Sequence, residues 1–483
     1  MVFSSLLFIF FFLPLNLLTY SIAGSIKAKN IVMLVFSLIF YACGEPVYVL
    51  LLVFMTLADY LCANYIDKQE FKSIKAKCGV AAMLVINLGL LAVFKYGSFL
   101  LSNLKFLTGF PKTVPSIILP IGISFYTFQL ISYVVDVYRK EVPAQRNFAK
   151  LLLYVSLFHQ CIAGPIVRYK DINEQLENRK ISKLEVAEGI RRFTYGLAKK
   201  AVLANACSAL CDALLGTAVT GKAAVNIGKQ TSILGLWVGI FAYALQIYLD
   251  FSAYSDMAIG MGKMIGFKYR ENFNYPYISK SVTEFWRRWH ISLGSFFRDY
   301  VYIPLGGNRK GALKTALNLL TVWFLTGLWH GASWNYVLWG LYFFVFILIE
   351  KIFLLKPLEK SKVVSHIYLC LVILFGWVLF RFRNLTAVIN VLKGMFGAYS
   401  NKFFDFETLT YIGQYAFIII FSAAACTPLF KYLNNKIFDK AFEKPTFKPI
   451  YFIARILLPF ALLFVSVAAL AGDSYNPFIY FQF

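Results

Sequence analysis

Residues Thr315–Glu350 read TALNLLTVWFLTGLWHGASWNYVLWGLYFFVFILIE, an apolar stretch of 36 residues. A single transmembrane helix uses about 17–25 residues, so this stretch is long enough for two crossings. Gly327 and Gly331 lie near its middle and mark the expected bend. Basic residues flank the stretch in the segment 309–314 and at Lys351, which places both ends in the cytosol by the positive-inside rule. We therefore predict a helical membrane fold that contains this hairpin.

His330 lies inside the stretch, in the segment Leu328–Trp334. An ionisable side chain at membrane depth is costly and is tolerated mainly where it faces a cavity, a partner or an ion path. At 1.5 Å per residue, His330 lies about 24 Å along a helix from Lys314, so we expect it deep in the membrane or toward its outer side. The alternative is an interhelical hydrogen bond without a chemical role. The chain has only four histidines, and a second one, His290, follows a Trp-Arg-Arg-Trp segment.

The composition also assigns the chain to a membrane. Hydrophobic residues make up 59% of the 483 residues and charged residues 15%, whereas a soluble domain has close to a quarter of its residues charged. The apolar runs predict an all-α polytopic membrane protein with about eleven transmembrane helices plus re-entrant and interfacial helices. The net charge of +24 is spread over short segments between apolar runs, as expected for cytosolic loops, and no nucleic-acid module accompanies it. The eight cysteines are scattered, which argues against a disulfide framework.

The apolar runs continue from end to end, so residues 1–483 are interpreted as one transmembrane domain. Met1–Gly24 is expected to be a retained first span, Gly44–Pro46 an outer turn and Asp67–Lys77 a cytosolic loop. The predicted parts are N-terminal helices (1–168), an interfacial and re-entrant core (169–314), and a catalytic hairpin with C-terminal helices (315–483).

The segment Lys263–Lys314 is basic, aromatic and rich in turns. It is too charged to span a membrane and too apolar for a solvated loop, so we predict a partly embedded cytosolic element that is buried in protein. Just before it, Asp250 and Asp256 stand six residues apart, which puts them on different faces of a helix. That spacing argues against a paired acid–base device.

A buried neutral imidazole can accept a proton near pH 7 and so deprotonate an attacking hydroxyl. A metal site needs three or four ligands in fixed geometry, whereas His290 and His330 supply only two, so no metal is predicted. Ser-His-Asp chemistry is not favoured either, because the sequence lacks a Gly-x-Ser-x-Gly elbow.

Ten motifs are spread over the whole chain: Met1–Ser5, Leu119–Tyr126, Asp136–Arg139, Ile162–Pro165, Asp250–Gly260, Glu271–Asn274, Thr283–Leu293, Leu305–Arg309, Gly327–Gly331 and Tyr480–Phe483. Together they resemble the motifs of the membrane-bound O-acyltransferase superfamily. Within that superfamily, the chain is similar to the type of the alginate O-acetyltransferase membrane subunit.

The resemblance implies a bundle of membrane helices around a central funnel or tunnel. It maps the catalytic histidine of the superfamily onto His330 and its second motif histidine onto His290. It also implies transfer of an acyl group, typically acetyl, toward an extracytoplasmic polysaccharide with the help of separate partner proteins. The branch that D-alanylates wall polymers is similar too, but it lacks the long match around Phe285–Ser292.

We therefore predict an O-acyltransferase in a bacterial plasma membrane, with no bound cofactor and with acetyl-CoA as the cytosolic thioester donor. His330 is the predicted general base, and His290 is expected nearer the cytosolic mouth, where it serves the donor. The predicted acceptor of the acyl group is an extracytoplasmic polysaccharide or a partner acyltransferase. The alternative is a transporter or flippase that moves a substrate without making bonds. The candidate substrate-binding residues are Arg168, Trp329, Trp286, Asn308 and His159.

Overall fold

The computed structural model describes residues 2–162, 164–217, 219–443 and 447–472. Throughout these residues the regular structure is helical and no strand occurs, so the predicted all-α fold is confirmed. The chain forms two compact units, one of residues 1–193, 254–271 and 295–303, the other of residues 194–253, 272–294 and 304–483. Three of the quoted motifs fall partly or wholly outside the described residues, through Met1, through Ala163 and through Tyr480–Phe483.

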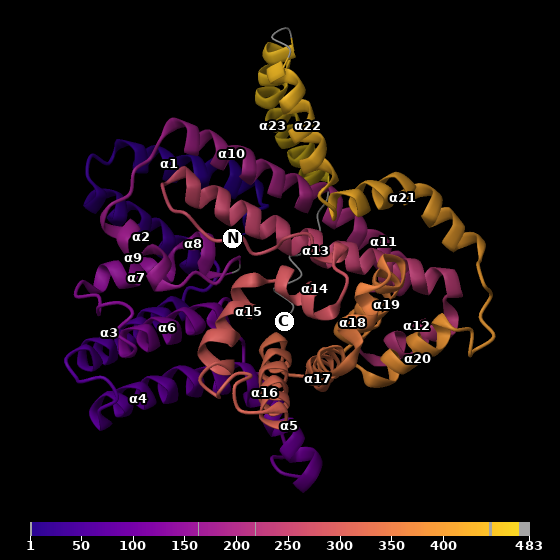
Figure 1. Cartoon of the computed structure of the whole chain (residues 1–483), viewed down its shortest axis with the longest axis horizontal. Coiled ribbons are helices and arrows are strands. Elements are labelled where there is room, and N and C mark those ends of the chain that lie inside the picture. Colours follow the sequence, from indigo (N-terminus) through magenta and orange to yellow (C-terminus); the bar gives the residue numbers. More distant parts are fainter. Residues whose placement is uncertain (1, 163, 218, 444–446, 473–483) are drawn as a thin grey trace. The chain divides into compact units, whose positions relative to one another are not determined.

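The first unit contains the N-terminal helices (Figure 1). These are α1 (Leu13–Ile22), α2 (Ile26–Ala42), α3 (Tyr48–Asp67), α4 (Ile74–Leu91), α5 (Gly97–Thr108), α6 (Ile123–Tyr138), α7 (Phe148–Ser156), α8 (Phe158–Cys161) and α9 (Tyr169–Glu177), with π-helical turns at Phe8–Phe12, Ala92–Tyr96 and Arg298–Tyr302. Three helices contribute residues to both units: α10 (Lys183–Ala198), α13 (Ile233–Met264) and α15 (Ile291–Phe297).

The second unit contains the remaining helices, among which α12 lies alongside α20 and α22 alongside α23 (Figure 1). These are α11 (Asn205–Leu215), α12 (Gly221–Gln230), α14 (Val282–Arg288), α16 (Ala312–His330), α17 (Trp334–Ile349), α18 (Leu355–Glu359), α19 (Lys362–Arg381), α20 (Leu385–Met395), α21 (Phe406–Ala425), α22 (Leu429–Glu443) and α23 (Phe447–Gly472), with π-helical turns at Lys199–Ala204 and Glu350–Leu354 and a 3₁₀ turn at Pro276–Ile278.

Polar side chains at the N-caps define where several of these helices begin. Ser361, Asn384 and Asp405 precede α19, α20 and α21, and each accepts a hydrogen bond from a backbone N–H of the first turn. Such caps satisfy N–H groups that the helix itself leaves without a partner, and each is worth about 1 kcal/mol.

Among the described residues, eight helices are long and apolar enough to cross a membrane. They correspond to Tyr48–Asp67, Ile74–Thr108, Ile233–Met264, Ala312–His330, Trp334–Glu359, Lys362–Arg381, Phe406–Ala425 and Phe447–Gly472. The predicted number of about eleven was higher because it included shorter apolar runs. Phe8–Ile22 is one of these shorter apolar helices. Within another predicted run, Leu151–Val167, residues 151–156 and 158–161 belong to the short helices α7 and α8 and are buried in the first unit.

The predicted hairpin is confirmed. Helix α16 ends at His330 and α17 begins at Trp334, so the bend occupies only three residues. The two helices pack along each other, and their closest approach involves Gly327 and Gly340. A side chain at Gly340 would collide with the backbone carbonyl of Trp323. Small residues at such a contact allow two membrane helices to approach at backbone distance.

The predicted outer turn at Gly44–Pro46 is also a break, between α2 and α3.

The two carboxylates of α13 behave as their spacing predicts. Asp250 pairs with Lys200, with an N–O distance of 2.9 Å, whereas Asp256 pairs with Arg192 at 2.9 Å. Because each carboxylate has a cation of its own, they do not act as a paired device.

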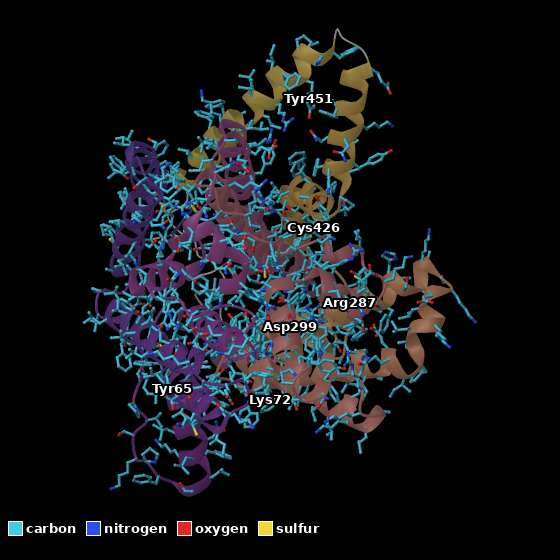
Figure 2. The ribbon with its side chains drawn as sticks, turned by 60° about the vertical axis from the view of Figure 1, so that its left-hand side comes forward. Tyr65, Lys72, Arg287, Asp299, Cys426 and Tyr451 are labelled. Carbon is cyan, nitrogen blue, oxygen red and sulfur yellow. The ribbon has the colours of Figure 1, made fainter. Side chains whose placement is uncertain are left out.

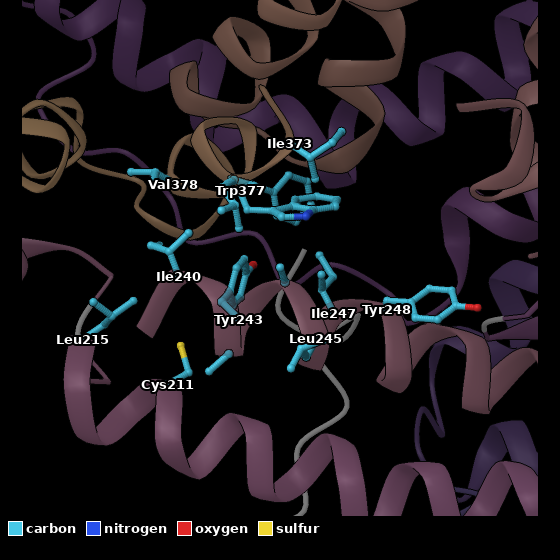
Figure 3. Packing of buried hydrophobic residues seen from close by; sticks show 14 of the residues in the cluster. Cys211, Leu215, Ile240, Tyr243, Leu245, Ile247, Tyr248, Ile373, Trp377 and Val378 are labelled. Carbon is cyan, nitrogen blue, oxygen red and sulfur yellow. The ribbon is translucent and has the colours of Figure 1, made fainter. Parts of the chain in front are cut away.

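The core of the second unit holds the hairpin and the elements that contact it. Figure 3 shows part of this core, where residues of α11 such as Leu215, residues of α13 such as Ile240 and Tyr243, and residues of α19 such as Ile373 and Trp377 pack together. All of these side chains are buried. The same continuous cluster includes Trp323, Trp339 and Trp289, so the core leads directly to the histidine residues.

Candidate active site

His330 is the last residue of α16 and its side chain is only 7% exposed. Its imidazole is enclosed by aromatic rings. The centroid distances are 4.8 Å to Trp329, 4.8 Å to Trp339 and 5.1 Å to Phe380. Gly331 follows, and a side chain there would collide with the ring of Tyr336, so this position of the bend requires glycine. His330 is therefore buried, as expected, and the groups that cover it are side chains of the protein.

His290 lies in the turn between α14 and α15, with a φ of 44°. This left-handed backbone is uncommon for a residue other than glycine and costs on the order of 1–3 kcal/mol. The turn is held by the segment 272–274, because the Ile291 N–H donates to the Asn272 carbonyl at 2.9 Å and the Asn274 N–H donates to the Arg288 carbonyl at 2.9 Å. These bonds direct the His290 side chain into the protein, where it is 2% exposed.

The amide oxygen of Asn272 determines the tautomer of His290. Asn272 Oδ1 lies 3.3 Å from His290 Nδ1, and it also accepts from the N–H of Ser292 at 3.1 Å and from its hydroxyl at 2.8 Å. Since that oxygen can only accept, Nδ1 of His290 carries the proton and Nε2 is left unprotonated. Burial lowers the pKa of His290 to about 3, so the ring is neutral near pH 7. Among the described residues, no group lies within hydrogen-bonding distance of the buried Nε2.

Trp329 contacts both imidazoles. Its ring centroid is 5.7 Å from that of His290 and 4.8 Å from that of His330. The two histidines can therefore be no farther apart than these two distances together. We expected His290 nearer the cytosolic mouth and His330 deeper, on the charge of Arg287 and Arg288. Both imidazoles contact one tryptophan, and their order in depth stays a prediction.

Trp286 also belongs to this site. Its ring lies 5.3 Å from that of Trp339, which in turn contacts His330. The rings of Trp286, Trp339, Phe343 and Phe380 form a connected cluster, the aromatic wall, of which Trp339 and Phe380 contact His330. The structure thus brings together His330, His290, Trp329 and Trp286 of the predicted site residues.

Asn308 lies elsewhere in the same unit. It is exposed in the turn before α16, whose length places it about 27 Å or more from the His330 end of the helix. The polar residue that orders this turn is Asn318, whose amide donates to the Gly307 carbonyl at 2.9 Å. Asn308, which was predicted from motif membership, thus lies at the opposite end of the helix from His330. Its contact with a substrate stays a prediction.

The other two predicted residues belong to the first unit. Arg168 is 4% exposed and already forms an ion pair with Asp299 at 2.8 Å, while its guanidinium also lies over the ring of Tyr300. His159 is buried, and its Nδ1 lies 3.4 Å from the hydroxyl of Tyr269. Their proposed contacts with a substrate stay predictions.

Sequence reasoning assigned no role to Asn272, Trp339 or Phe380. Asn272 stands within the quoted motif Glu271–Asn274, so a signal for it was present. Trp339 and Phe380 carried no separate signal, because large aromatic residues in apolar helices serve equally well in a core or at a lipid surface. Within the described residues, no group of three or more His, Cys, Asp and Glu side chains is arranged to hold a metal ion.

Comparison with known proteins identifies the family of this chain. The profile of the MBOAT, membrane-bound O-acyltransferase family matches residues 139–388, which include both histidines. The chain belongs to this family. It is 36% identical to a protein named "Probable alginate O-acetylase AlgI" from Pseudomonas putida, with 100% of both chains covered.

Two other relatives are more distant. The peptidoglycan O-acetyltransferase of Helicobacter pylori is 33% identical over 82% of this chain and 80% of its own. The teichoic acid D-alanyltransferase of Bacillus subtilis is 29% identical over 46% of this chain and 56% of its own. This membrane-bound O-acyltransferase family member is thus an O-acyltransferase and a multi-pass membrane protein, and the alternative of a transporter without acyl chemistry is not supported.

Proposed function

We propose that this O-acyltransferase moves an acetyl group from cytosolic acetyl-CoA toward a hydroxyl of an extracytoplasmic polysaccharide, in a bacterial plasma membrane. The acetyl group is handed either to the polymer itself or to a partner acyltransferase. The names of two relatives, an alginate O-acetylase and a peptidoglycan O-acetyltransferase, support acetyl as the acyl group and a polysaccharide as the final acceptor.

His330 acts as the general base. It takes the proton of the acceptor hydroxyl while the oxygen attacks the thioester carbonyl, so that a C–O bond forms and the carbonyl oxygen becomes an oxyanion. The intermediate collapses, the C–S bond breaks, and the departing thiolate takes the proton back from the imidazolium. The observation that carries this proposal is the position of His330 at the end of α16, beside His290 and inside the aromatic wall.

His290 contributes a second, neutral imidazole. With Nδ1–H held by Asn272, its bare Nε2 is an acceptor of fixed direction in the same buried region. Such an atom can accept a hydrogen bond from the incoming hydroxyl or from the donor, and it orients that group without taking its proton permanently.

The basic segment 263–314 binds the acyl donor in this proposal. Arg287, directly before the His290 turn, is exposed (Figure 2), and Arg309 and Lys310 are exposed as well. Cations of this kind suit the phosphate groups of coenzyme A. Arg287 lies three residues before His290, so a donor held by Arg287 can place its thioester end at the histidine site.

Replacement of His330 tests the proposal. Inside-out membrane vesicles from cells that carry only the variant chain are given acetyl-CoA labelled in the acetyl group, and both free CoA and labelled polymer are measured. His330→Ala is expected to lower transfer by about 10²–10⁴-fold, as loss of a general base does. His366→Ala, on α19, is the matched control, because His366 contacts only the Lys362 carbonyl of its own helix among the described bonds. If His330→Ala keeps more than about a tenth of the wild-type rate, His330 is not the base.

A further inference from the structure

Two indole N–H groups near His330, one on Trp339 in contact with it and one on Trp286 in contact with Trp339, have no acceptor among the described residues. Trp339 is 1% exposed, and its Nε1 is buried without a hydrogen-bond partner in the described part of the chain. The Nε1 of Trp286 is buried in the same way. An indole N–H can only donate, and leaving a buried donor without an acceptor costs about 1–3 kcal/mol. Two such costs in one site call for a functional reason.

The same unit satisfies comparable groups elsewhere. Trp377 Nε1 donates to the hydroxyl of Tyr277 at 3.2 Å, and Trp237 Nε1 donates to the Met395 carbonyl at 2.9 Å. Trp377 is as deeply buried as Trp339, and their rings lie 6.4 Å apart. Buried tryptophans of this unit can thus have an acceptor, whereas Nε1 of Trp339 and Nε1 of Trp286 have none among the described residues.

Their geometry relates both to the reacting groups. The Trp339 ring stands nearly perpendicular to His330, at 79° and with centroids 4.8 Å apart. The Trp286 ring stands at 89° to Trp339, with centroids 5.3 Å apart. In a wall of rings that excludes water, an N–H donor interacts with a developing negative charge much more strongly than in water.

The end of α16 makes such donors necessary. His330 lies at the C-terminus of the helix, where the backbone carbonyls carry a partial negative charge. That charge stabilises the imidazolium that forms when His330 takes a proton, but it repels an oxyanion formed next to it. Neutral donors from outside α16 are needed to balance it, and Trp339 on α17 and Trp286 on α14 meet that requirement.

We propose that the indole N–H groups of Trp339 and Trp286 donate to the thioester oxygen as it becomes an oxyanion. This inference rests on the proposed function, since it names the partners of the carbonyl that His330-assisted attack converts. The acceptor hydroxyl loses its proton to His330, its oxygen bonds to the carbonyl carbon, and the former π electrons move to the oxygen that the two N–H groups face. When the C–S bond breaks, the carbonyl re-forms and the hydrogen bonds weaken.

An isosteric substitution tests the N–H groups without changing the ring. Trp339 is replaced with 3-benzothienylalanine, which has the shape of tryptophan but a sulfur in place of the N–H, by suppression of a stop codon. The expected result is a fall in kcat of at least about tenfold, toward the 10²–10³-fold that loss of an oxyanion donor costs. The KM for acetyl-CoA and the thermal midpoint should stay close to wild type, because packing is retained.

The matched control is the same substitution at Trp377, which loses a satisfied hydrogen bond and is expected to keep its kcat. Trp286→Phe serves as an independent second variant, with an expected fall in kcat. Wild-type kcat for the benzothienyl residue at position 339 would overturn the proposal and assign the oxyanion to other donors, such as the first turn of α17. If His330→Ala is inactive in the same vesicles while this variant is fully active, only the oxyanion assignment fails and the proposed function stands.

Discussion

A single amide oxygen decides which nitrogen of His290 carries a proton. Asn272 Oδ1 receives two hydrogen bonds from Ser292 and faces His290 Nδ1, so both the amide and the ring have one allowed orientation. A partner that fixes an imidazole in this way is the usual means of presenting the other nitrogen to a substrate. The left-handed backbone of His290 is retained because the bonds of the segment 272–274 hold it.

Replacement of His290 is expected to affect donor use more than proton transfer. In His290→Ala the KM for acetyl-CoA rises, or kcat falls by a smaller factor than in His330→Ala, because the general base is still present. Steady-state kinetics of both variants, normalised to folded protein, measure the difference. Wild-type kinetics in the surviving fraction of His290→Ala would leave His290 with a structural role alone.

Thermal unfolding at two pH values compares the stability of His290→Ala with that of the wild type. The pKa of His290 is about 3 in the folded protein and near 6.5 in an unfolded chain. Only the unfolded chain takes up the proton between these values, so this residue's share of the stability is complete above about pH 6.5 and is lost as pH falls toward 3. His290→Ala should therefore lose less stability than wild type between pH 7.5 and pH 5.

At the scale of elements, one buried carboxylate attaches α14 to the hairpin. Glu350 directly follows α17 and is 1% exposed. Its two oxygens accept from the N–H of Val282 at 2.6 Å, the N–H of Thr283 at 2.8 Å and the hydroxyls of Thr283 and Tyr368. Through these bonds, the helix that carries Trp286 and leads to His290 is fixed to the helix that carries Trp339.

Loss of this carboxylate should therefore lower both stability and rate. We expect Glu350→Ala to lower the free energy of unfolding by roughly 2–4 kcal/mol, since several hydrogen bonds to a charged group are lost at a buried site. We also expect a lower kcat in the folded fraction, with a smaller loss in Glu350→Gln, which keeps one acceptor oxygen. Glu359→Ala, at the exposed end of α18, is the matched control. Unchanged kcat in folded Glu350→Ala would show that α14 holds its position without this contact.

At the scale of the whole molecule, the Lys and Arg distribution still determines the expected topology. Lys72 is exposed in the turn between α3 and α4 (Figure 2), and Cys43 is exposed in the turn between α2 and α3, beside Gly44. If the positive-inside rule holds, these two ends of one span face opposite sides of the membrane.

Cysteine labelling in intact cells tests this topology. In a background without the other native cysteines, Lys72→Cys should resist a membrane-impermeant maleimide, while Cys43 should react with it. The native Cys43 is the positive control because it reports that the outer surface is accessible. Labelling of position 72 in intact cells would reverse the predicted orientation, including the cytosolic position of the donor segment.

The sequence alone determined the membrane class, the hairpin of residues 315–350, the break at Gly44–Pro46, the separate roles of Asp250 and Asp256, and His330 and His290 as the central pair. These follow from length, local polarity and spacing, which are properties of the chain read in order. The tertiary structure alone decided that residues 151–162 are buried in protein, because a core and a lipid surface favour the same apolar residues. It alone decided that Trp329 contacts both imidazoles, that Asn272 orients one of them and that the N–H of Trp339 lacks an acceptor, because each depends on packing between residues that lie far apart in the chain.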